Sequence, residues 1–389
     1  MNKFRLSLIF VSVVLVSLMS CRKDEPTPPT PPSPTEASRT VLVYMAANNN
    51  LGSNRFDAMD IAEMQTAAAK GHIGTGRLLV YQAPYNKAPL MLDVRKDAID
   101  TLKVYDRNTM SVEAARMAEV FADVEKLAPA ADYGLVLWSH GTGWIHDGIE
   151  TGFRQKSFGE ENGKKMNTST LAAVITEAPI DFSFLYFDCC YMMSIECLYE
   201  LRNAVPLIAG SATELPSPGM PYDLNVARFF ATPNADIVGA ATNTYETYDS
   251  YSGIDRTCTM SVVNTDGIAS LAEAARAIYE ACGGGLPEGY EPQRFSYISV
   301  AACKYFDFKD YMHELCARAG RADLAEAFDN AFDDVVLYSA ATPRLWNSLD
   351  LDRHNGISTY ILRDANSIST GNYNQLSWYA DVASAIKFE

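Results

Sequence analysis

The sequence predicts an α/β fold, with a mostly parallel sheet and helices on both faces, from three observations. Apolar runs of strand length alternate with segments whose apolar residues recur at helical spacing, the pattern of a doubly wound sheet. The apolar runs show little alternation with polar residues, as expected of strands covered on both faces. A chain of 389 residues can also bury a large core, as one domain or two.

The clearest elements lie before residue 226. Fully apolar runs there predict strands, and the segments between them carry apolar residues at helical spacing. The strands are expected at Thr40–Met45, 78–81, 133–138, 184–187 and 207–209. The helices are expected at 56–69, 111–128, 171–177 and 192–202. Ser111 fits the N-cap of its helix, and the polar segment 148–167 is expected to be an exposed loop.

The chain beyond residue 225 gives more mixed signals. Helical spacing and strand-like runs alternate there, with helices expected at 227–248, 268–281 and 322–337 and strands at 258–263 and 356–362. Periodicity alone does not decide whether this part continues the first sheet or packs as a subdomain. We therefore divide the folded chain into an α/β domain, residues 39–225, and a C-terminal α/β extension, residues 226–389, that packs on the sheet or continues it.

The N-terminus has the pattern of an export signal rather than of a folded segment. Two basic residues precede an apolar run, 6–19, that is short for a membrane span. The run ends in Leu-Met-Ser-Cys21, which resembles a bacterial lipobox; an ordinary secretory signal is the alternative. The lipobox implies that residues 1–20 are removed and that Cys21 carries lipid. Residues 21–38 contain a stretch rich in proline, threonine and serine and are expected to form an extended tether.

Such a signal predicts an exported lipoprotein of the outer membrane, held at the membrane by its N-terminal lipid. Residues 22–25 also resemble an acidic export tag of surface lipoproteins, which extends the expectation to the cell surface. The formal charge of −16 argues against nucleic acid as a partner, because phosphate binding needs a basic footprint. The cysteines after Cys21 include no Cys-x-x-Cys pair and no His/Cys cluster at zinc spacing, so no metal site is expected.

Two of the predicted strands end in chemically reactive residues. His140 and Gly141 follow the strand at 133–138, and Cys190 follows the strand at 184–187. Chemistry gathers at the carboxyl ends of parallel strands, where a thiol and an imidazole are suited to act as nucleophile and base. Taken singly, His140 also fits a strand-end cap and Cys190 a buried structural thiol. The amides of Gly141 and Cys190 are the candidate donors to an oxyanion.

Longer motifs around these residues resemble the clostripain family of cysteine endopeptidases. The segment Trp138-Ser139-His140-Gly141-Thr142-Gly143-Trp144 is similar to the family's His-Gly-x-Gly-Trp signature. Asp188-Cys189-Cys190-Tyr191-Met192 is similar to its Asp-Ala-Cys-Leu-Met nucleophile motif, and Glu196 follows at the family's spacing. Supporting similarity covers residues 44–51, 306–308 and 356–360. The resemblance implies a caspase-like α/β fold, with Cys190 as the nucleophile and His140 as the base or acid.

The same resemblance implies a preference for arginine or lysine before the cleaved bond. Asp188 matches one acid of the family's pocket for basic side chains. Relatives tend to carry a second aspartate just before a glycine, where this chain has Pro218, and Glu214 is the nearby candidate to replace it. Asp188 also fits a simpler role, as a carboxylate that caps a turn. Cys189 falls where relatives usually have a small residue and is expected to be structural.

The sequence therefore predicts a cysteine endopeptidase that hydrolyses a peptide or protein substrate through a Cys190–His140 dyad. The alternatives are a non-catalytic surface lipoprotein that binds ligands in the same cleft, and a thiol acyltransferase. No organic cofactor is implied; some clostripain-like enzymes use calcium, but no Asp-x-Asp-x-Asp-Gly loop occurs here. Some relatives mature by self-cleavage at a basic residue between the two motifs. The candidates here, with a charged surface loop as the alternative, are Arg154, Lys156, Lys164 and Lys165.

Overall fold

The central sheet is built on five parallel strands that carry some of the most apolar segments of the chain. The computed structural model describes residues 36–145 and 157–388. The parallel strands are β1 (Thr40–Met45), β2 (Arg77–Gln82), β5 (Tyr133–Trp138), β8 (Phe182–Asp188) and β9 (Leu207–Gly210), in the order β9-β8-β5-β1-β2. Every residue of β1 and β5 is buried, as expected where helices cover both faces of a sheet.

Antiparallel strands extend the sheet at both edges. β3 (Leu90–Val94) and β4 (Ile99–Val104) lie beyond β2, and β10 (Thr259–Asn264) and β12 (Val336–Ala341) lie beyond β9. The last two strands come from beyond residue 225, so the later part of the chain continues the sheet. The edge strands β4 and β12 are only partly buried, since each has a neighbour on one side alone.

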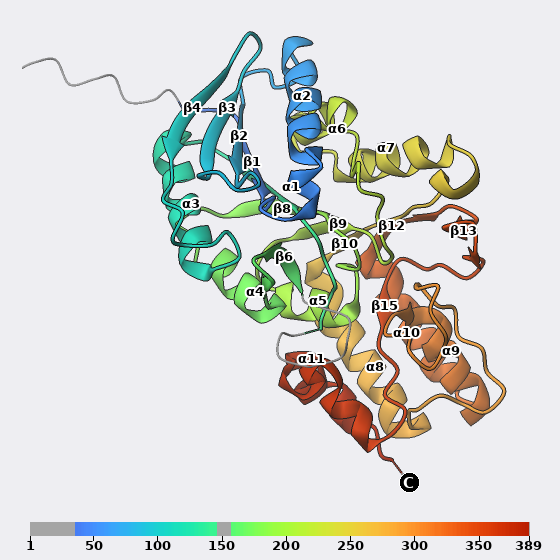
Figure 1. The fold of residues 1–389 in the computed structure, drawn as a ribbon. Helices are drawn as coiled ribbons and strands as arrows, with labels where there is room; N and C mark the ends of the chain where they lie inside the picture. The colour runs from blue at the N-terminus through green and yellow to red at the C-terminus, as the bar shows by residue number, and fades with distance from the viewer. Residues whose placement is uncertain (1–35, 146–156, 389) are drawn as a thin grey trace, which may run out of the picture. The chain divides into compact units, whose positions relative to one another are not determined.

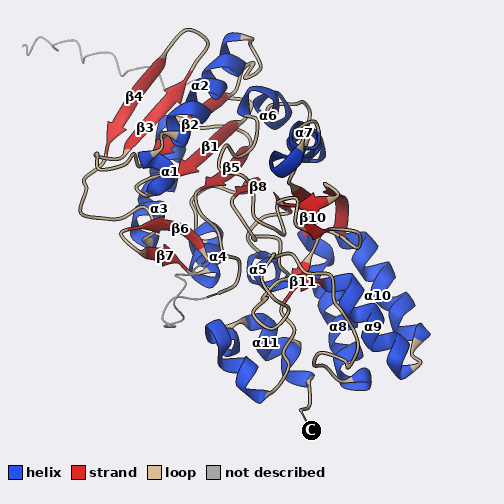
Figure 2. Cartoon of the chain, turned by 45° about the vertical axis from the view of Figure 1, so that its right-hand side comes forward, coloured by secondary structure: helices blue, strands red, loops and turns tan. Residues whose placement is uncertain are grey.

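Helices pack on both faces of the sheet, and each face has its own apolar core (Figures 1 and 2). Odd-numbered residues of β1 belong to one core and even-numbered residues to the other, as the two-residue period of a strand requires. The first core includes α2 (Phe56–Ala69), α6 (Tyr222–Phe229) and α7 (Ile237–Asp249). The second includes α3 (Ala114–Leu127), α4 (Thr168–Thr176), α5 (Ile195–Leu201) and α8 (Ile268–Cys282).

The C-terminal part of the chain adds helices beside α8. α9 (Phe308–Ala319) and α10 (Ala322–Val335) pack on α8, and the three lie side by side in Figures 1 and 2. The short elements there are β11 (Phe306–Asp307), β13 (Arg344–Leu345), β14 (Leu349–Asp350), β15 (Ser358–Thr359) and α11 (Ser377–Asp381), with 3₁₀ turns at 365–375 and 383–385. Two further 3₁₀ turns flank β10, at 253–255 and 265–267. The Ser358 N–H donates to the Met193 carbonyl at 2.9 Å, which ties this region to the chain after β8.

A small hairpin, β6 (Phe158–Glu161) and β7 (Lys164–Met166), lies against the loop that follows β5. The N–H of Gly159 donates to the carbonyl of His140 at 2.9 Å. Gly141 and Phe158 form an isolated antiparallel bridge at the same place. The hairpin therefore holds the backbone of the His-Gly motif from one side.

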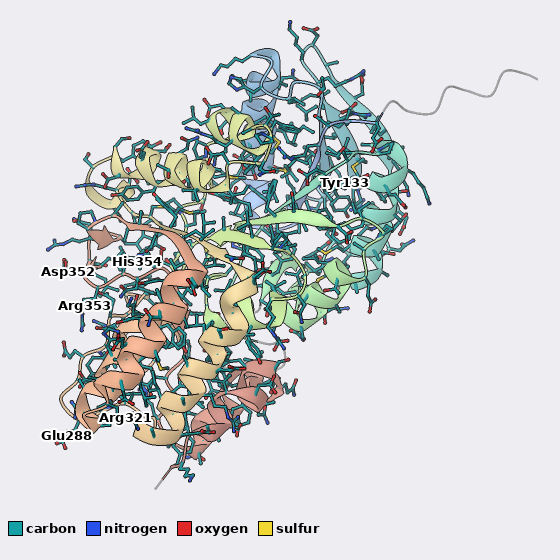
Figure 3. The ribbon with its side chains drawn as sticks, turned by 180° about the vertical axis from the view of Figure 1, so that it is seen from behind. Tyr133, Glu288, Arg321, Asp352, Arg353 and His354 are labelled. Carbon is teal, nitrogen blue, oxygen red and sulfur yellow. The ribbon has the colours of Figure 1, made fainter. Side chains whose placement is uncertain are left out.

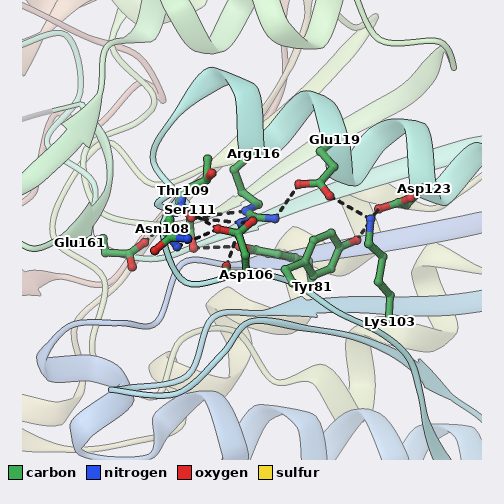
Figure 4. Close-up of polar contacts among 11 residues, drawn as sticks. Tyr81, Lys103, Asp106, Asn108, Thr109, Ser111, Arg116, Glu119, Asp123 and Glu161 are labelled. Carbon is green, nitrogen blue, oxygen red and sulfur yellow. Dashed lines mark hydrogen bonds and ion pairs between the residues drawn. The ribbon is translucent and has the colours of Figure 1, made fainter.

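Glu161 fixes this hairpin to the rest of the sheet. Its carboxylate accepts the backbone N–H of Ser111 at 2.6 Å and the side-chain amide of Asn48 at 2.8 Å. Figure 4 shows Ser111 next to the buried Arg116, whose guanidinium bonds to the carboxylate of Asp106 at 2.9 Å. The hairpin is thus bonded through Glu161 to the polar residues that precede α3.

Several predicted boundaries are wrong for local reasons. α3 begins after Ser111, because the Ser111 hydroxyl bonds to the hydroxyl of Tyr81 at 3.0 Å instead of capping the helix. The predicted helix 227–248 is two helices, α6 and α7. Pro233 lies in the gap between them, and the side chain of Asp236 caps α7. The helix predicted to reach residue 337 ends at 335, where the chain passes directly into β12.

Other predictions fall partly or wholly outside the described residues. Residues 1–20, the lipidation candidate Cys21 and most of the tether 21–38 are outside them, as are Arg154 and Lys156. The described remainder of the predicted loop 148–167 contains the β6–β7 hairpin. Within residues 36–145 and 157–388, no helix combines the length and apolar content needed to cross a membrane.

Candidate active site

The two sequence motifs meet at the carboxyl ends of β5 and β8. These strands are parallel neighbours, and their last residues, Trp138 and Asp188, lie opposite each other. A Cβ atom on Gly141 would lie 2.4 Å from the carbonyl oxygen of Cys190 and 2.9 Å from the Cβ of Cys189. Only glycine permits this approach, which brings the backbone of the His-Gly motif directly against the cysteine pair.

A cavity of about 710 Å³ opens at this edge of the sheet. His140 and Cys190 both line it, together with the predicted substrate-binding residues Asp188 and Glu214. Its other walls include side chains from far along the sequence, among them Tyr297, Lys304, Tyr305 and Trp346. The structure thus brings all four predicted side chains together in one cavity. It also shows that residues outside the sequence motifs form part of the cavity wall.

His140 is half-buried and held by the short helix α1 (Asn50–Ser53). Its Nε2 atom lies 2.6 Å from Oδ1 of Asn50, and the side chain of Asn49 caps the helix. Burial lowers the pKa of His140 below its ordinary value; Glu160 opposes this shift and Lys165 adds to it. The imidazole is therefore mostly neutral near pH 7 and able to accept a proton.

Cys190 is partly exposed and fixed by the segment after β9. The backbone N–H of Leu215 donates to Sγ at 3.3 Å. The next residue, Tyr191, has a φ of 61°, an uncommon conformation for a large side chain that turns the chain sharply after the cysteine. Burial raises the pKa of Cys190 to about 11, with smaller contributions in the same direction from Glu214 and Asp188. The thiol is thus protonated near pH 7 and needs a base to become nucleophilic.

Cys189 lies in a different environment from its neighbour. Its side chain is buried, and its thiol donates to the carbonyl of Leu137 at 3.1 Å. Burial raises the pKa of the Cys189 thiol well above its ordinary value. This cysteine packs as a small apolar residue at the core side of the cavity.

Asp188 is a buried carboxylate in the cavity wall. Its Oδ1 atom accepts the backbone N–H of Met220 at 3.2 Å, while Oδ2 has no hydrogen bond of normal length among the described residues. The buried hydroxyl of Tyr222 lies close enough to this carboxylate to lower its pKa in part. Gly219 lies over it, so close that a Cβ atom there would be 2.7 Å from Oδ2. Burial raises the pKa of Asp188 to about 7. A buried oxygen at a cavity that lacks a hydrogen bond of normal length is suited to a ligand that donates hydrogen bonds.

Glu214 also lines the cavity, and its carboxylate is held by a residue that sequence reasoning missed. Oε2 accepts the indole N–H of Trp346 at 2.6 Å. Pro218, at the position where relatives tend to carry a second aspartate, is exposed and does not belong to the cavity wall that the structure describes. It lies in a turn that the Gly219 N–H closes by donating to the Pro216 carbonyl at 2.9 Å.

The missed residues differ in how far the sequence could have revealed them. Asn50 lies within the family-like segment 44–51, so a motif marked its position without giving it a role. Trp346 lies in no motif and joins the site only through the tertiary fold. Among residues 36–145 and 157–388, no three His, Cys, Asp or Glu side chains are arranged to hold a metal ion.

Comparisons with known proteins point to one family of cysteine peptidases. A family model described as the clostripain family matches residues 43–388. A secreted C11 cysteine protease from Bacteroides thetaiotaomicron, solved with an irreversible peptide inhibitor, is 29% identical, covering 89% of this chain and 99% of that one with a TM-score of 0.73. An inactive zymogen C11 protease from Parabacteroides distasonis is 30% identical, covering 90% and 99% with a TM-score of 0.76. A search of curated proteins found no match.

A third structure supports the fold alone. The Bacteroides thetaiotaomicron protease called iotapain is 21% identical, covers 89% of this chain and 99% of its own, and has a TM-score of 0.77. The predicted caspase-like α/β fold is confirmed, and the chain is a cysteine peptidase. Because the family model spans nearly all of the described residues, this chain belongs to the clostripain family.

Proposed function

We propose that this cysteine peptidase cleaves peptide bonds with Cys190 as the nucleophile and His140 as its general base. The observation that carries the proposal is the close contact of Gly141 with Cys190, which sets both side chains in one cavity. The neutral imidazole takes the thiol proton as sulfur attacks the carbonyl carbon, and then donates it to the leaving amine. Water hydrolyses the resulting acyl-enzyme and frees the thiol.

The amides of Gly141 and Cys190 are the proposed donors to the oxyanion. Hydrogen bonds to the hairpin flank Gly141, through the carbonyl of His140 and the N–H of Thr142, so the Gly141 N–H points away from the hairpin. The Cys190 nitrogen would lie 3.2 Å from a Cβ on Gly141, so the two amides are neighbours. Neighbouring N–H groups beside a nucleophile are the usual means of stabilising a tetrahedral oxyanion.

The proposed substrate has arginine or lysine at P1, the residue whose carbonyl is attacked. Asp188 supports this, because its Oδ2 has no hydrogen bond of normal length among the described residues and the carboxylate lines the cavity. Glu214 supplies a second carboxylate in the same cavity. A cationic side chain would give both groups the partner that buried or half-buried carboxylates require.

A peptide library varied at P1, applied to the wild type, Cys190→Ala and Cys189→Ala, tests the proposal. We expect cleavage after arginine or lysine by the wild type and by Cys189→Ala, and none by folded Cys190→Ala. Cleavage by Cys190→Ala would place the nucleophile elsewhere. A folded wild type that turns over no peptide would favour a binding role for the cavity, and a preference for acidic or apolar P1 would remove the role given to Asp188.

We further propose that the enzyme is exported as an outer-membrane lipoprotein with lipid on Cys21. The lipobox-like sequence supports this, and one similar structure is described as a secreted protease. Labelled palmitate should enter the wild type and not Cys21→Ala. We also propose that hydrolysis needs no organic cofactor. Calcium dependence, which the family resemblance leaves open, is decided by measuring turnover before and after chelation with EGTA.

A further inference from the structure

Two carboxylates share the cavity with the nucleophile, and the described residues place no cation against either. Asp188 Oδ2 forms no hydrogen bond of normal length there and has the neutral hydroxyl of Tyr222, not a cation, beside it. Glu214 accepts its side-chain bond on Oε2, which leaves Oε1 available. Lys304 also lines the cavity, but its ammonium lies over the ring of Tyr360, 5.2 Å from the centroid. Carboxylates without a cation in a partly enclosed site indicate a positively charged ligand.

Trp346 reaches Glu214 from a turn with an unfavourable backbone conformation. Trp346 and Asn347, between β13 and β14, have φ angles of 50° and 52°. The left-handed region is costly for a bulky side chain and persists where the surrounding structure imposes it. Leu345 is fully buried, and the Trp346 N–H donates to Oγ1 of Thr257 at 3.0 Å. The turn therefore fixes the position of the indole before any ligand binds.

The backbone at Glu214 is equally constrained and lies close to the nucleophile. The Thr213 hydroxyl donates to the Glu214 carbonyl at 3.1 Å, and the next residue, Leu215, donates its N–H to the sulfur of Cys190. The Glu214 carboxylate is thus held within a short segment that contacts the reacting atom. It is placed to act on the side chain of the residue being attacked, whereas Pro218 offers no acid.

We propose that Trp346 is a positioning residue that fixes Glu214, so that Glu214 and Asp188 together hold the guanidinium of a P1 arginine. The inference rests on the proposed peptidase function and its basic P1 preference. A guanidinium has five N–H donors in a planar fork and stacks on aromatic faces, whereas an ammonium is a compact charge. Two carboxylates beside an indole therefore suit arginine better than lysine.

The test compares Trp346→Phe, Glu214→Gln and the double variant on matched arginine and lysine P1 substrates, with kcat and KM measured separately. Each single variant is expected to raise KM for the arginine substrate about 10-fold with a smaller change for lysine, the effect of losing one charge-assisted contact. The double variant should be no worse than the poorer single variant, because the indole acts through the carboxylate. Asn347→Gly, which keeps the turn and the indole, is the matched control and should behave as the wild type.

The outcomes separate this inference from the proposed function. If Trp346→Phe leaves the arginine KM unchanged, or if its effect adds fully to that of Glu214→Gln, Trp346 does not position Glu214. A wild type that prefers lysine to arginine also overturns the inference. Failure of the proposed function is seen separately, as cleavage by Cys190→Ala or as a folded wild type that cleaves after neither arginine nor lysine.

Discussion

Gly141 brings the His-Gly loop of the candidate site directly against the backbone of Cys190. A methyl group there would overlap the Cys190 carbonyl oxygen at 2.4 Å, and this neighbour is backbone that cannot rotate away. Gly141→Ala is therefore expected to push the His-Gly loop away from the nucleophile and lower kcat/KM at least about 100-fold, as misplacement of reacting groups does. Steady-state kinetics, with circular dichroism to verify folding, checks this. A folded variant with near wild-type activity would show that the contact is not needed for catalysis.

The role proposed for Asp188 predicts that substrate recognition depends on pH. Burial raises its pKa to about 7, so the carboxyl group is largely neutral at pH 6 and largely charged at pH 8. Because only the charged form pairs with a cation, KM for a basic P1 substrate should fall as pH rises from 6 to 8. Asp188→Asn should bind poorly and lose this dependence, while a substrate with an apolar P1 should not show it. The same pH dependence of KM in Asp188→Asn would assign it to another group.

The β6–β7 hairpin contributes charge to the site as well as support for the His-Gly loop. Lys165 on β7 has a side chain only 4% exposed, lies 3.7 Å from Glu160, and lowers the pKa of both Cys190 and His140. Lys165→Met should raise both pKa values. Alkylation of Cys190 at pH 7.5 should then be about 3-fold slower, and the rise of activity with pH should move to higher pH.

Lys164 offers a matched control on the same strand, because its residue is exposed while that of Lys165 is half-buried. Lys164→Met is expected to alkylate and hydrolyse as the wild type does. Equal effects of the two substitutions would show that Lys165 acts only through the overall charge of the surface and not through its position beside the site. An unchanged alkylation profile in Lys165→Met would show that its ammonium does not act on the thiol.

The elements that sequence reasoning recovered are those whose pattern is purely local. β1, β5 and β8 are fully or almost fully buried, so their apolar runs identify them without knowledge of their neighbours. β3 and β4 were missed, because β4 is a partly exposed edge strand with mixed residues and β3 pairs with it in a hairpin. β12 follows α10 without a break, so helical spacing continued past the true end of the helix.

The candidate site shows the same division at the scale of the whole molecule. His140, Gly141, Asp188 and Cys190 could be found from the sequence, because each follows an apolar run and lies in a compact motif. Trp346 could not, since it comes from a turn beyond β12 and reaches the cavity only because the later chain packs over the carboxyl edge of the sheet. Resemblance to a family suggests which residue is the nucleophile, whereas the wall of the cavity depends on long-range packing.

Two buried ionisable groups are expected to make the free energy of unfolding depend on pH. One lowers it as pH rises towards 7, and the other lowers it as pH falls below about 6.5. Glu196 on α5 is fully buried, which raises its pKa to about 7, and it accepts bonds from Thr359, Tyr360 and Tyr373 on Oε1. Between about pH 4.5 and 7, this carboxyl group is protonated in the folded state and charged in the unfolded state. The free energy of unfolding that the bound proton contributes is therefore lost as pH rises through this range. His354, labelled in Figure 3, lies beside the edge strand β12, with its Nδ1 atom 3.1 Å from the Ser339 hydroxyl. Burial of the ring lowers its pKa to about 4, so the stability it contributes is lost as pH falls below about 6.5.

The variant Glu196→Gln tests whether Glu196 causes the loss of stability as pH rises. Glu196 Oε2 has no hydrogen-bond partner among the described residues, so the amide nitrogen of glutamine can take its place while the amide oxygen keeps the three donors. The variant should have a free energy of unfolding about 3 kcal/mol higher than the wild type at pH 8, and less than about 1 kcal/mol higher at pH 5. Its unfolding temperature should therefore rise more at pH 8 than at pH 5. Glu200→Gln, on the same helix but only half-buried, is the control for the substitution itself. Thermal unfolding followed by circular dichroism measures all three proteins, and a Glu196→Gln effect of the same size at pH 5 and pH 8 would show that the buried carboxyl is not the group that titrates.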